Sequence, residues 1–229
     1  VRRAAIQALV EGPAAHQRAP AARNDCLAAI AERVHDTDVH VVIAALRSAA
    51  TYDDPRSIAL LRAALANRDF NVRAVAIDGL GLRKAREAVP RLAQLARHDP
   101  SVSVRFEAAT HLAAIDRAAA LPLADELLAA PSPYVRTAGV AVLATSTDAT
   151  AFVRLSRLAQ ADPSVRVREA AVDAFGGRSD ALAREVVRRA LADTDSVVVA
   201  TACGVANKNK WSDLAGVIAA IPTRFPGAT

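Results

Sequence analysis

Histidine and cysteine, the side chains that most often bind metal ions or act as nucleophiles, are few and scattered in this sequence. It holds five histidines and two cysteines among 229 residues. His35 and His98 stand at equivalent positions two units apart in an internal repeat, which at about 10 Å per stacked helix separates the rings by about 20 Å, too far to share a metal ion. Cys26 and Cys203 match no ligand or redox spacing, so we expect two buried free thiols. The sequence therefore predicts no catalytic residue, no metal site and no cofactor.

Arginine supplies a second kind of functional group, the guanidinium group, and it recurs at a regular position in the sequence. One arginine directly follows a repeated valine in most units of the repeat: Arg2, Arg73, Arg105, Arg136 and Arg168. Guanidinium groups stacked ~10 Å apart could receive the phosphates or carboxylates of an acidic partner. Alternatively, each arginine could bond a capping aspartate or a backbone carbonyl of a neighbouring turn. We favour the structural role, because every unit also supplies acidic residues.

The repeat itself is visible when two stretches of sequence are aligned. Residues 99–105 (DPSVSVR) are echoed two units later by residues 162–168 (DPSVRVR). Weaker copies lie between and around them, and each contains a valine that we use as the anchor of its unit. The anchors are Val1, Val41, Val72, Val104, Val135, Val167 and Val198. The first interval, from Val1 to Val41, is longer than the others, which are nearly equal and fall in the range of helical repeats.

The residues behind each anchor predict one face of a helix. The fourth residue after the anchor is always small: Ala5, Ala45, Ala76, Ala108, Gly139, Ala171 and Ala202. With apolar residues five and eight positions after the anchor, these residues form an apolar stripe where another helix backbone can come close. We expect the aspartate five residues before the anchor to cap this helix and Pro100 and Pro163 to occupy its first position. We expect the helix to end near Gly81, Gly176 and Asn207 in three of the units.

A second apolar column, twelve residues before each anchor, predicts another helix in each unit. Its expected ranges are 23–34, 55–66, 86–97, 119–129, 149–161 and 180–192. Alanine is the most frequent residue type and aromatic side chains make up only 3% of the chain, a composition that favours close-packed helices over β-sheets. We therefore predict an all-α chain with a leading helix at 1–10, six helix pairs within about 21–207 and a final helix at 212–221. A single pair cannot bury both its faces, so the pairs should stack into one solenoid over residues 1–229.

The pattern Asp-Pro-x-x-x-Val-Arg-x-x-Ala, carried by residues 99–108 and 162–171, resembles the short bacterial form of the HEAT repeat. The resemblance covers essentially the whole chain. It implies a right-handed α-α superhelix in which the second helix of each pair lines the concave side. It further implies a role as an interaction surface or as an appendage to a catalytic domain, because a fold of this kind does not fix a function.

On such a concave side, the residues two and six positions after the anchor would face a partner. The candidate contact residues are Arg3, Gln7, Arg47, Asp78, Phe106, Thr110, Glu169 and Asp173. Their character changes along the chain from basic, through small and apolar, to acidic. This gradient argues against a nucleic-acid groove, which needs continuous positive charge, and it suits a bipolar protein or peptide. The alternative is a surface that faces only solvent.

Two irregular segments could add contacts at the rims of the solenoid. The long first interval places an insertion within residues 11–22, which contains His16 and Arg18, and inserted loops often carry specificity. Residues 207–211 hold Lys208, Lys210 and the only tryptophan, Trp211. A more ordinary role for Trp211, which we favour, is to pack under the last helix as a partial cap.

These observations lead to a main hypothesis and two alternatives. The main hypothesis is a non-catalytic scaffold that binds a protein or peptide on its concave face. The first alternative is a substrate-positioning segment of a larger enzyme, of the peptidase or prolyl isomerase type. The second is polyanion or nucleic-acid binding, which rests only on the net charge of +5 and which we disfavour because stacking aromatic residues are scarce.

The remaining expectations concern the state of the chain. No stretch reaches the ~18 consecutive apolar residues of a membrane span, so we expect no membrane insertion. The sequence begins with Val1 and contains no methionine, so we expect it to be part of a longer protein. Ends without polar caps could cause self-association. Two unpaired cysteines and no export signal favour the cytoplasm.

Overall fold

The computed structural model describes residues 20–221, and in this range the chain contains helices and loops but no strand. The predicted leading helix at 1–10 and the candidate residues Arg3, Gln7, His16 and Arg18 lie outside the described residues. The predicted all-α, helical-repeat fold is confirmed. The described chain divides into two compact units with a boundary between Ala120 and Leu121.

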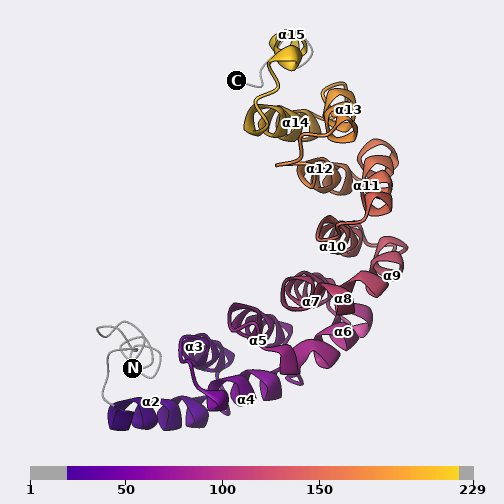
Figure 1. The fold of residues 1–229 in the computed structure, drawn as a ribbon. Helices are drawn as coiled ribbons and strands as arrows, with labels where there is room; N and C mark the ends of the chain where they lie inside the picture. The colour runs from indigo at the N-terminus through magenta and orange to yellow at the C-terminus, as the bar shows by residue number, and fades with distance from the viewer. Residues whose placement is uncertain (1–19, 222–229) are drawn as a thin grey trace. The chain divides into compact units, whose positions relative to one another are not determined.

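The first unit is built from pairs of helices in two layers (Figure 1). The first helices of the pairs are α2 (Pro20–Arg33), α4 (Pro55–Ala64) and α6 (Val89–His98), the last preceded by the short 3-10 helix η2 (Arg86–Ala88). The second helices are α3 (Val39–Ala50), α5 (Phe70–Leu82) and α7 (Val102–Ile115), followed by the short α8 (Arg117–Ala120). Helix α5 packs between α3 and α7, so the second helices form one continuous layer in this unit.

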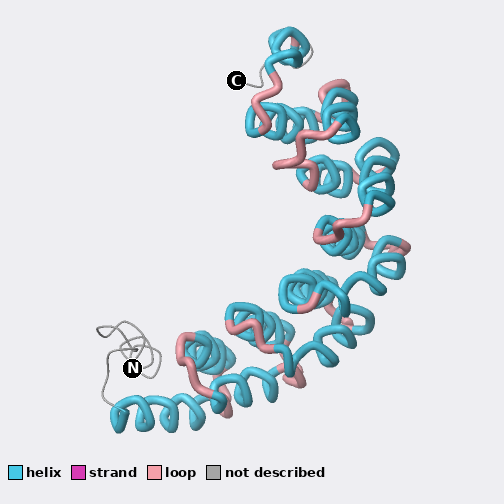
Figure 2. Tube along the Cα trace, viewed as in Figure 1, coloured by secondary structure: helices cyan, strands magenta, loops and turns pink. Residues whose placement is uncertain are grey.

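The second unit repeats the arrangement. Its first helices are η3 (Leu121–Leu123) with α9 (Ala124–Leu128), α11 (Ala149–Ala161) and α13 (Ala181–Ala190). Its second helices are α10 (Pro133–Ala144), α12 (Val165–Asp173) and α14 (Ser196–Lys208), and α12 packs against both of the others. The unit ends with η4 (Ser212–Leu214) and α15 (Ala215–Ala219). Figure 2 shows that short loops connect these helices within each unit.

The anchors and the small column form the core of each unit. The valines from Val41 to Val198 are all buried, and Ala45, Ala76 and Ala108 have no exposed surface. Gly139 shows why the column is small: a Cβ atom at this position would lie 2.8 Å from Leu128 Cγ and 3.1 Å from the Leu128 backbone nitrogen. Among the residues twelve positions before the anchors, on the first helices, Leu92, Leu123, Leu155 and Val186 are buried. In α4, Leu61 is buried in place of the expected Leu60.

The predicted start of the second helices is wrong by two residues. Helices α7 and α12 have Ser101 and Ser164 as N-caps, so Pro100 and Pro163 precede the helices. Asp99 and Asp162 instead accept the backbone N–H groups of Ser101 and Ser164, at 2.8 and 2.9 Å. An aspartate before Pro-Ser can act either as the N-cap of the helix or as the hydrogen-bond acceptor of the preceding turn. Here it closes the turn that leads into the helix.

The predicted helix ends are correct to within one residue for α5, which ends at Leu82, and for α14, which ends at Lys208, but α12 ends at Asp173, three residues before Gly176. The left-handed backbone conformation occurs at Lys84, Gly177 and Lys210, with φ of 48°, 99° and 56°. These residues lie one to three positions beyond the expected Gly81, Gly176 and Asn207. Gly81 lies inside α5, and its missing side chain serves another purpose, described below. Among the described helices, none combines the length and the hydrophobicity needed to cross a membrane.

Candidate binding surface

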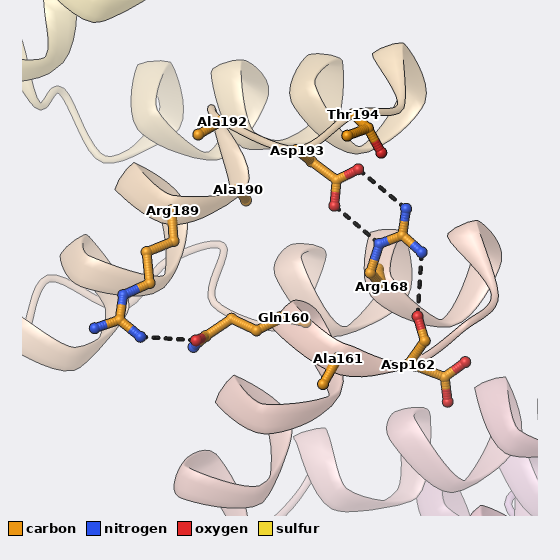
Figure 3. A pocket seen from close by; sticks show the side chains of 10 residues that line it. Gln160, Ala161, Asp162, Arg168, Arg189, Ala190, Ala192, Asp193 and Thr194 are labelled. Carbon is orange, nitrogen blue, oxygen red and sulfur yellow. Dashed lines mark hydrogen bonds and ion pairs between the residues drawn. The ribbon is translucent and has the colours of Figure 1, made fainter.

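The repeat arginines are used to tie consecutive units of the repeat together. Arg73 donates from Nε and Nη2 to the two carboxylate oxygens of Asp99, both at 2.7 Å. Arg136 pairs in the same way with Asp162, at 3.0 and 2.9 Å. Arg168 pairs with Asp193, at 2.8 and 3.0 Å (Figure 3). The predicted structural role is therefore confirmed for these three arginines.

Each of these arginines also holds the loop of its own repeat. The remaining guanidinium nitrogen, Nη1, donates to two consecutive backbone carbonyls; for Arg73 these belong to Asn67 and Arg68, at 2.9 and 3.0 Å. Arg168 donates to the Asp162 carbonyl at 3.1 Å, so Asp162 receives Arg136 on its carboxylate and Arg168 on its backbone. This double use leaves the guanidinium groups saturated with internal partners.

The Arg136–Asp162 and Arg168–Asp193 pairs shift the pKa values of their members. The hydrogen bond from Arg168 lowers the pKa of Asp193 despite its partial burial. Burial acts to raise the pKa of Asp162, but the hydrogen bonds from Arg136 and from the Ser164 backbone outweigh it and lower the pKa. The hydrogen bond to Asp162 correspondingly raises the pKa of Arg136. These carboxylates are therefore held ionised at neutral pH.

One repeat arginine does not follow this pattern. Asp99, Asp162 and Asp193 each stand five residues before the anchor valine of their repeat. In the repeat that follows Arg105, this position is Ala130. Within the described residues, Nε of Arg105 has no hydrogen-bond partner. Arg105 therefore belongs to the sequence pattern without making the carboxylate pair.

A pocket of about 430 Å³ beside Arg168 illustrates what the pairing means for ligands (Figure 3). It lies where the loop after α11 meets the loop after α13 in the second unit. Its two cationic side chains already have partners: Arg168 binds Asp193, and Arg189 binds Glu185 at 2.6 Å and Gln160 at 2.7 Å. A phosphate or carboxylate would have to compete with these internal acceptors, so the pocket is poorly suited to an anionic ligand.

The candidate contact residues of the first unit lie on its second helices. Arg47 on α3 and Asp78 on α5 are exposed, whereas Phe106 and Thr110 on α7 are half-buried. The Thr110 hydroxyl donates to the carbonyls of its own helix, at 3.0 and 3.1 Å, so it is already satisfied. The charged residues are thus better placed to meet a partner than the two residues of α7.

In the second unit the acidic candidates keep their exposure. Asp173 on α12 is exposed and Glu169 is half-exposed on the same helix. Lys208 at the end of α14 and Lys210 in the next turn are also exposed. Trp211 is 6% exposed and its ring lies 5.6 Å from the guanidinium carbon of Arg184, consistent with the packing role.

The cysteines differ from each other. Cys26 is buried as expected, but Cys203 is only half-buried, so the prediction of two buried thiols is wrong for Cys203. Cys203 lies on α14, directly before the exposed Gly204. Burial raises the pKa of the Cys203 thiol, which keeps it protonated and poorly nucleophilic at neutral pH.

A cluster of three ionisable side chains was not predicted as a unit. Nε2 of His111 on α7 lies 3.0 Å from an Asp78 carboxylate oxygen on α5 and 3.8 Å from a Glu107 oxygen one turn earlier on α7. Spacing between histidines does not reveal this cluster, and Asp78 falls in a column predicted to contact a partner. The available signal was the spacing from the anchors: the residues lie three, six and seven positions after their anchors, on adjacent helices.

Comparison with known proteins relates part of the chain to a known repeat family. The family model of HEAT repeats matches residues 62–144. No curated protein matches the sequence. The X-ray structure of YibA from Escherichia coli has a TM-score of 0.61 at 19% identity, over 96% of this chain and 80% of YibA. A structure of the complex of CpcE and CpcF of phycocyanin lyase from Nostoc sp. PCC7120 has a TM-score of 0.53 at 17% identity, over 98% of this chain and 93% of the other.

Proposed function

Because residues 62–144 match the family model of HEAT repeats, we propose that this chain is a non-catalytic module that binds a protein or peptide along the exposed face of its second helices. The observation that supports this role is which charged side chains have internal partners and which ones face solvent. Three of the regularly spaced arginines bind internal carboxylates, whereas Arg47, Asp78, Glu169 and Asp173 are among the charges that the second helices present to solvent.

This distribution favours a protein over a polyanion. A nucleic acid or heparin requires an unbroken basic surface that releases counterions. Of the four candidate charges, Arg47 on α3 is basic, whereas Asp78 on α5 and Glu169 and Asp173 on α12 are acidic. A partner of mixed charge can pair with residues of both signs, and its charges would set the orientation of binding more than the affinity.

The structural relatives support a protein partner at the level of fold. The Nostoc structure is a complex of two protein chains, CpcE and CpcF. The same structure belongs to a lyase, which favours a second candidate, the positioning of a substrate for an enzyme. In that case the second-helix face would bind the substrate rather than a separate partner.

The test begins with capture of partners from a lysate of the source cells, with nuclease treatment, followed by affinity measurement with the purified partner. We expect Glu169→Lys combined with Asp173→Lys to weaken binding at least about tenfold, since each lost rim charge pair contributes up to ~1 kcal/mol and each new like-charge contact opposes binding. Arg157→Glu on the first helix α11 is the matched control, because Arg157 is exposed on the other layer.

Two outcomes would count against the proposal. Unchanged affinity in both the Glu169/Asp173 variant and an Arg47→Glu variant would remove the second-helix face from consideration. Retention only on heparin, lost at moderate salt, would indicate nonspecific polyanion binding instead. If the captured partner is an enzyme whose turnover rather than affinity changes in the variants, the second candidate is supported.

A further inference from the structure

We propose that Asp78, Glu107 and His111 form a binding site for a divalent transition-metal ion of the Zn²⁺ class on the second-helix layer of the first unit. The three side chains come from two adjacent helices, α5 and α7, that pack directly against each other. One ligand-capable atom from each residue lies within 4.8 Å of the other two. The proposed site does not rest on the proposed partner binding, although Asp78 also belongs to the candidate contact residues.

The distances are close to those that a metal ion would need. With bonds of about 2.0–2.2 Å to nitrogen and oxygen, two ligands of a tetrahedral zinc ion lie about 3.3–3.6 Å apart. The imidazole nitrogen of His111 is 3.0 Å from the Asp78 oxygen and 3.8 Å from the Glu107 oxygen. These two distances lie just below and just above the expected range, and the two carboxylates are at most 4.8 Å apart.

The histidine is held in place by a feature of the facing helix. A Cβ atom at Gly81 would lie 2.0 Å from Nδ1 of His111, so only glycine allows the ring to lie against the α5 backbone. In this position Nδ1 faces α5 and Nε2 faces the two carboxylates. Glu107 and His111 are four residues apart on α7, a spacing that places two ligands on the same helix face.

The charges of the cluster favour a cation. Asp78 and Glu107 place two carboxylates around one imidazole, and no arginine or lysine that the structure describes forms an ion pair with either of them. With a neutral histidine, the cluster would carry two negative charges in close proximity. A divalent ion would neutralise both carboxylates and use the neutral imidazole as its third ligand.

The donor set also indicates the class of metal. One imidazole nitrogen and two carboxylate oxygens suit zinc and related transition metals, whereas calcium and magnesium prefer oxygen ligands alone. Asp78 is exposed and the other two residues are half-buried, so the site is open on its solvent side. Three protein ligands would leave a fourth position for water or for a donor from another molecule.

The test uses the full chain, freed of metal with a chelator, and Zn²⁺ alone as the probe in calorimetric titration at neutral pH. We expect one bound ion per chain in the wild type and at least about tenfold weaker binding in His111→Gln and in Asp78→Asn. The matched control is His98→Gln, because His98 is an exposed histidine on α6 in the same unit. Its titration should be indistinguishable from that of the wild type.

A second readout separates loss of a ligand from loss of the fold. Co²⁺ in place of Zn²⁺ should give a visible absorption band in the wild type, and circular dichroism should show that each variant remains helical. Gly81→Ala, which keeps all three ligands but displaces the ring, should also weaken binding. Absence of Zn²⁺ binding in the wild type, or equal binding in the folded His111→Gln and Asp78→Asn variants, would overturn the proposal and leave the cluster as an ion pair only.

Discussion

Arg73 and Asp99 form a bidentate ion pair between two consecutive repeats, with both nitrogen–oxygen distances at 2.7 Å. Their side chains are only 9% and 2% exposed. In a stack of small repeats, each unit is stabilised mainly by its neighbours. The pair therefore fixes the register of α5 against the turn that leads into α7. It contributes specificity as well as stability, because each partner would be costly to bury alone.

Removal of one member should reveal that cost. We expect Arg73→Ala to lower the free energy of unfolding by about 3–5 kcal/mol, because it leaves the Asp99 carboxylate buried and uncompensated. Urea unfolding followed by circular dichroism would measure the change. The matched control is Arg105→Ala, which should cost distinctly less, since the equivalent acidic position in the next unit is Ala130. Equal losses in the two variants would mean that the carboxylate pair does not determine the effect.

The ion pairs also predict how stability depends on pH. The hydrogen bond from Arg168 lowers the pKa of Asp193 in the folded state below the value of about 3.9 in the unfolded chain. The unfolded state therefore binds this proton first as the pH falls, so the stabilisation is complete above about pH 4 and is lost as the pH falls through the folded-state pKa.

Unfolding in urea at a series of pH values between neutral and acidic would measure this loss. We expect Asp193→Asn to be less stable than the wild type at neutral pH and to show a shallower fall of stability below about pH 4. Asp173→Asn, which removes an exposed carboxylate from α12, should follow the wild-type curve closely. A pH profile of Asp193→Asn parallel to that of the wild type would contradict the assigned role of the pair.

The small column gives a prediction about packing. Ala108 has no exposed surface, so Ala108→Leu should overpack the contact of α7 with its neighbours and cost about 1–3 kcal/mol. Ala114→Leu, on the exposed side of the same helix, should change stability by less than about 0.5 kcal/mol. Thermal or urea unfolding of the two variants side by side would show the difference, and equal stabilities would mean that the column does not lie at a helix contact.

Features of the fold could be predicted from the sequence where the determining interaction is local. The buried valines and the column from Ala45 to Ala202 follow from periodicity alone, because a residue on the inner stripe of a helix must be apolar, and small where backbones approach. The caps could not be placed this way: Asp99 and Ser101 are both good capping residues, and the choice depends on the ion pair with Arg73 from another unit.

The cluster around His111 was missed for a related reason, because spacing from the anchors places its members on adjacent helices but does not fix the register between those helices. Its members share no position in the repeat, and only the register between α5 and α7 brings Asp78 next to His111. Gly81 fits the pattern of a helix end because glycine commonly ends helices. Its actual role, to leave space for an imidazole ring, depends on His111, a residue of the next unit.

Trp211, the only tryptophan, provides a direct test of packing against partner contact. Trp211 is 6% exposed, and its backbone N–H donates to the Ala206 carbonyl at 3.0 Å, which fixes the residue at the end of α14. We therefore expect blue-shifted fluorescence that acrylamide quenches weakly in the folded protein and strongly in urea. Trp211→Ala should lower the free energy of unfolding by about 3–5 kcal/mol, whereas Lys210→Ala, at the exposed neighbouring position, should cost much less. Native quenching as strong as that in urea would instead place the indole at the surface, where it could serve as a contact residue.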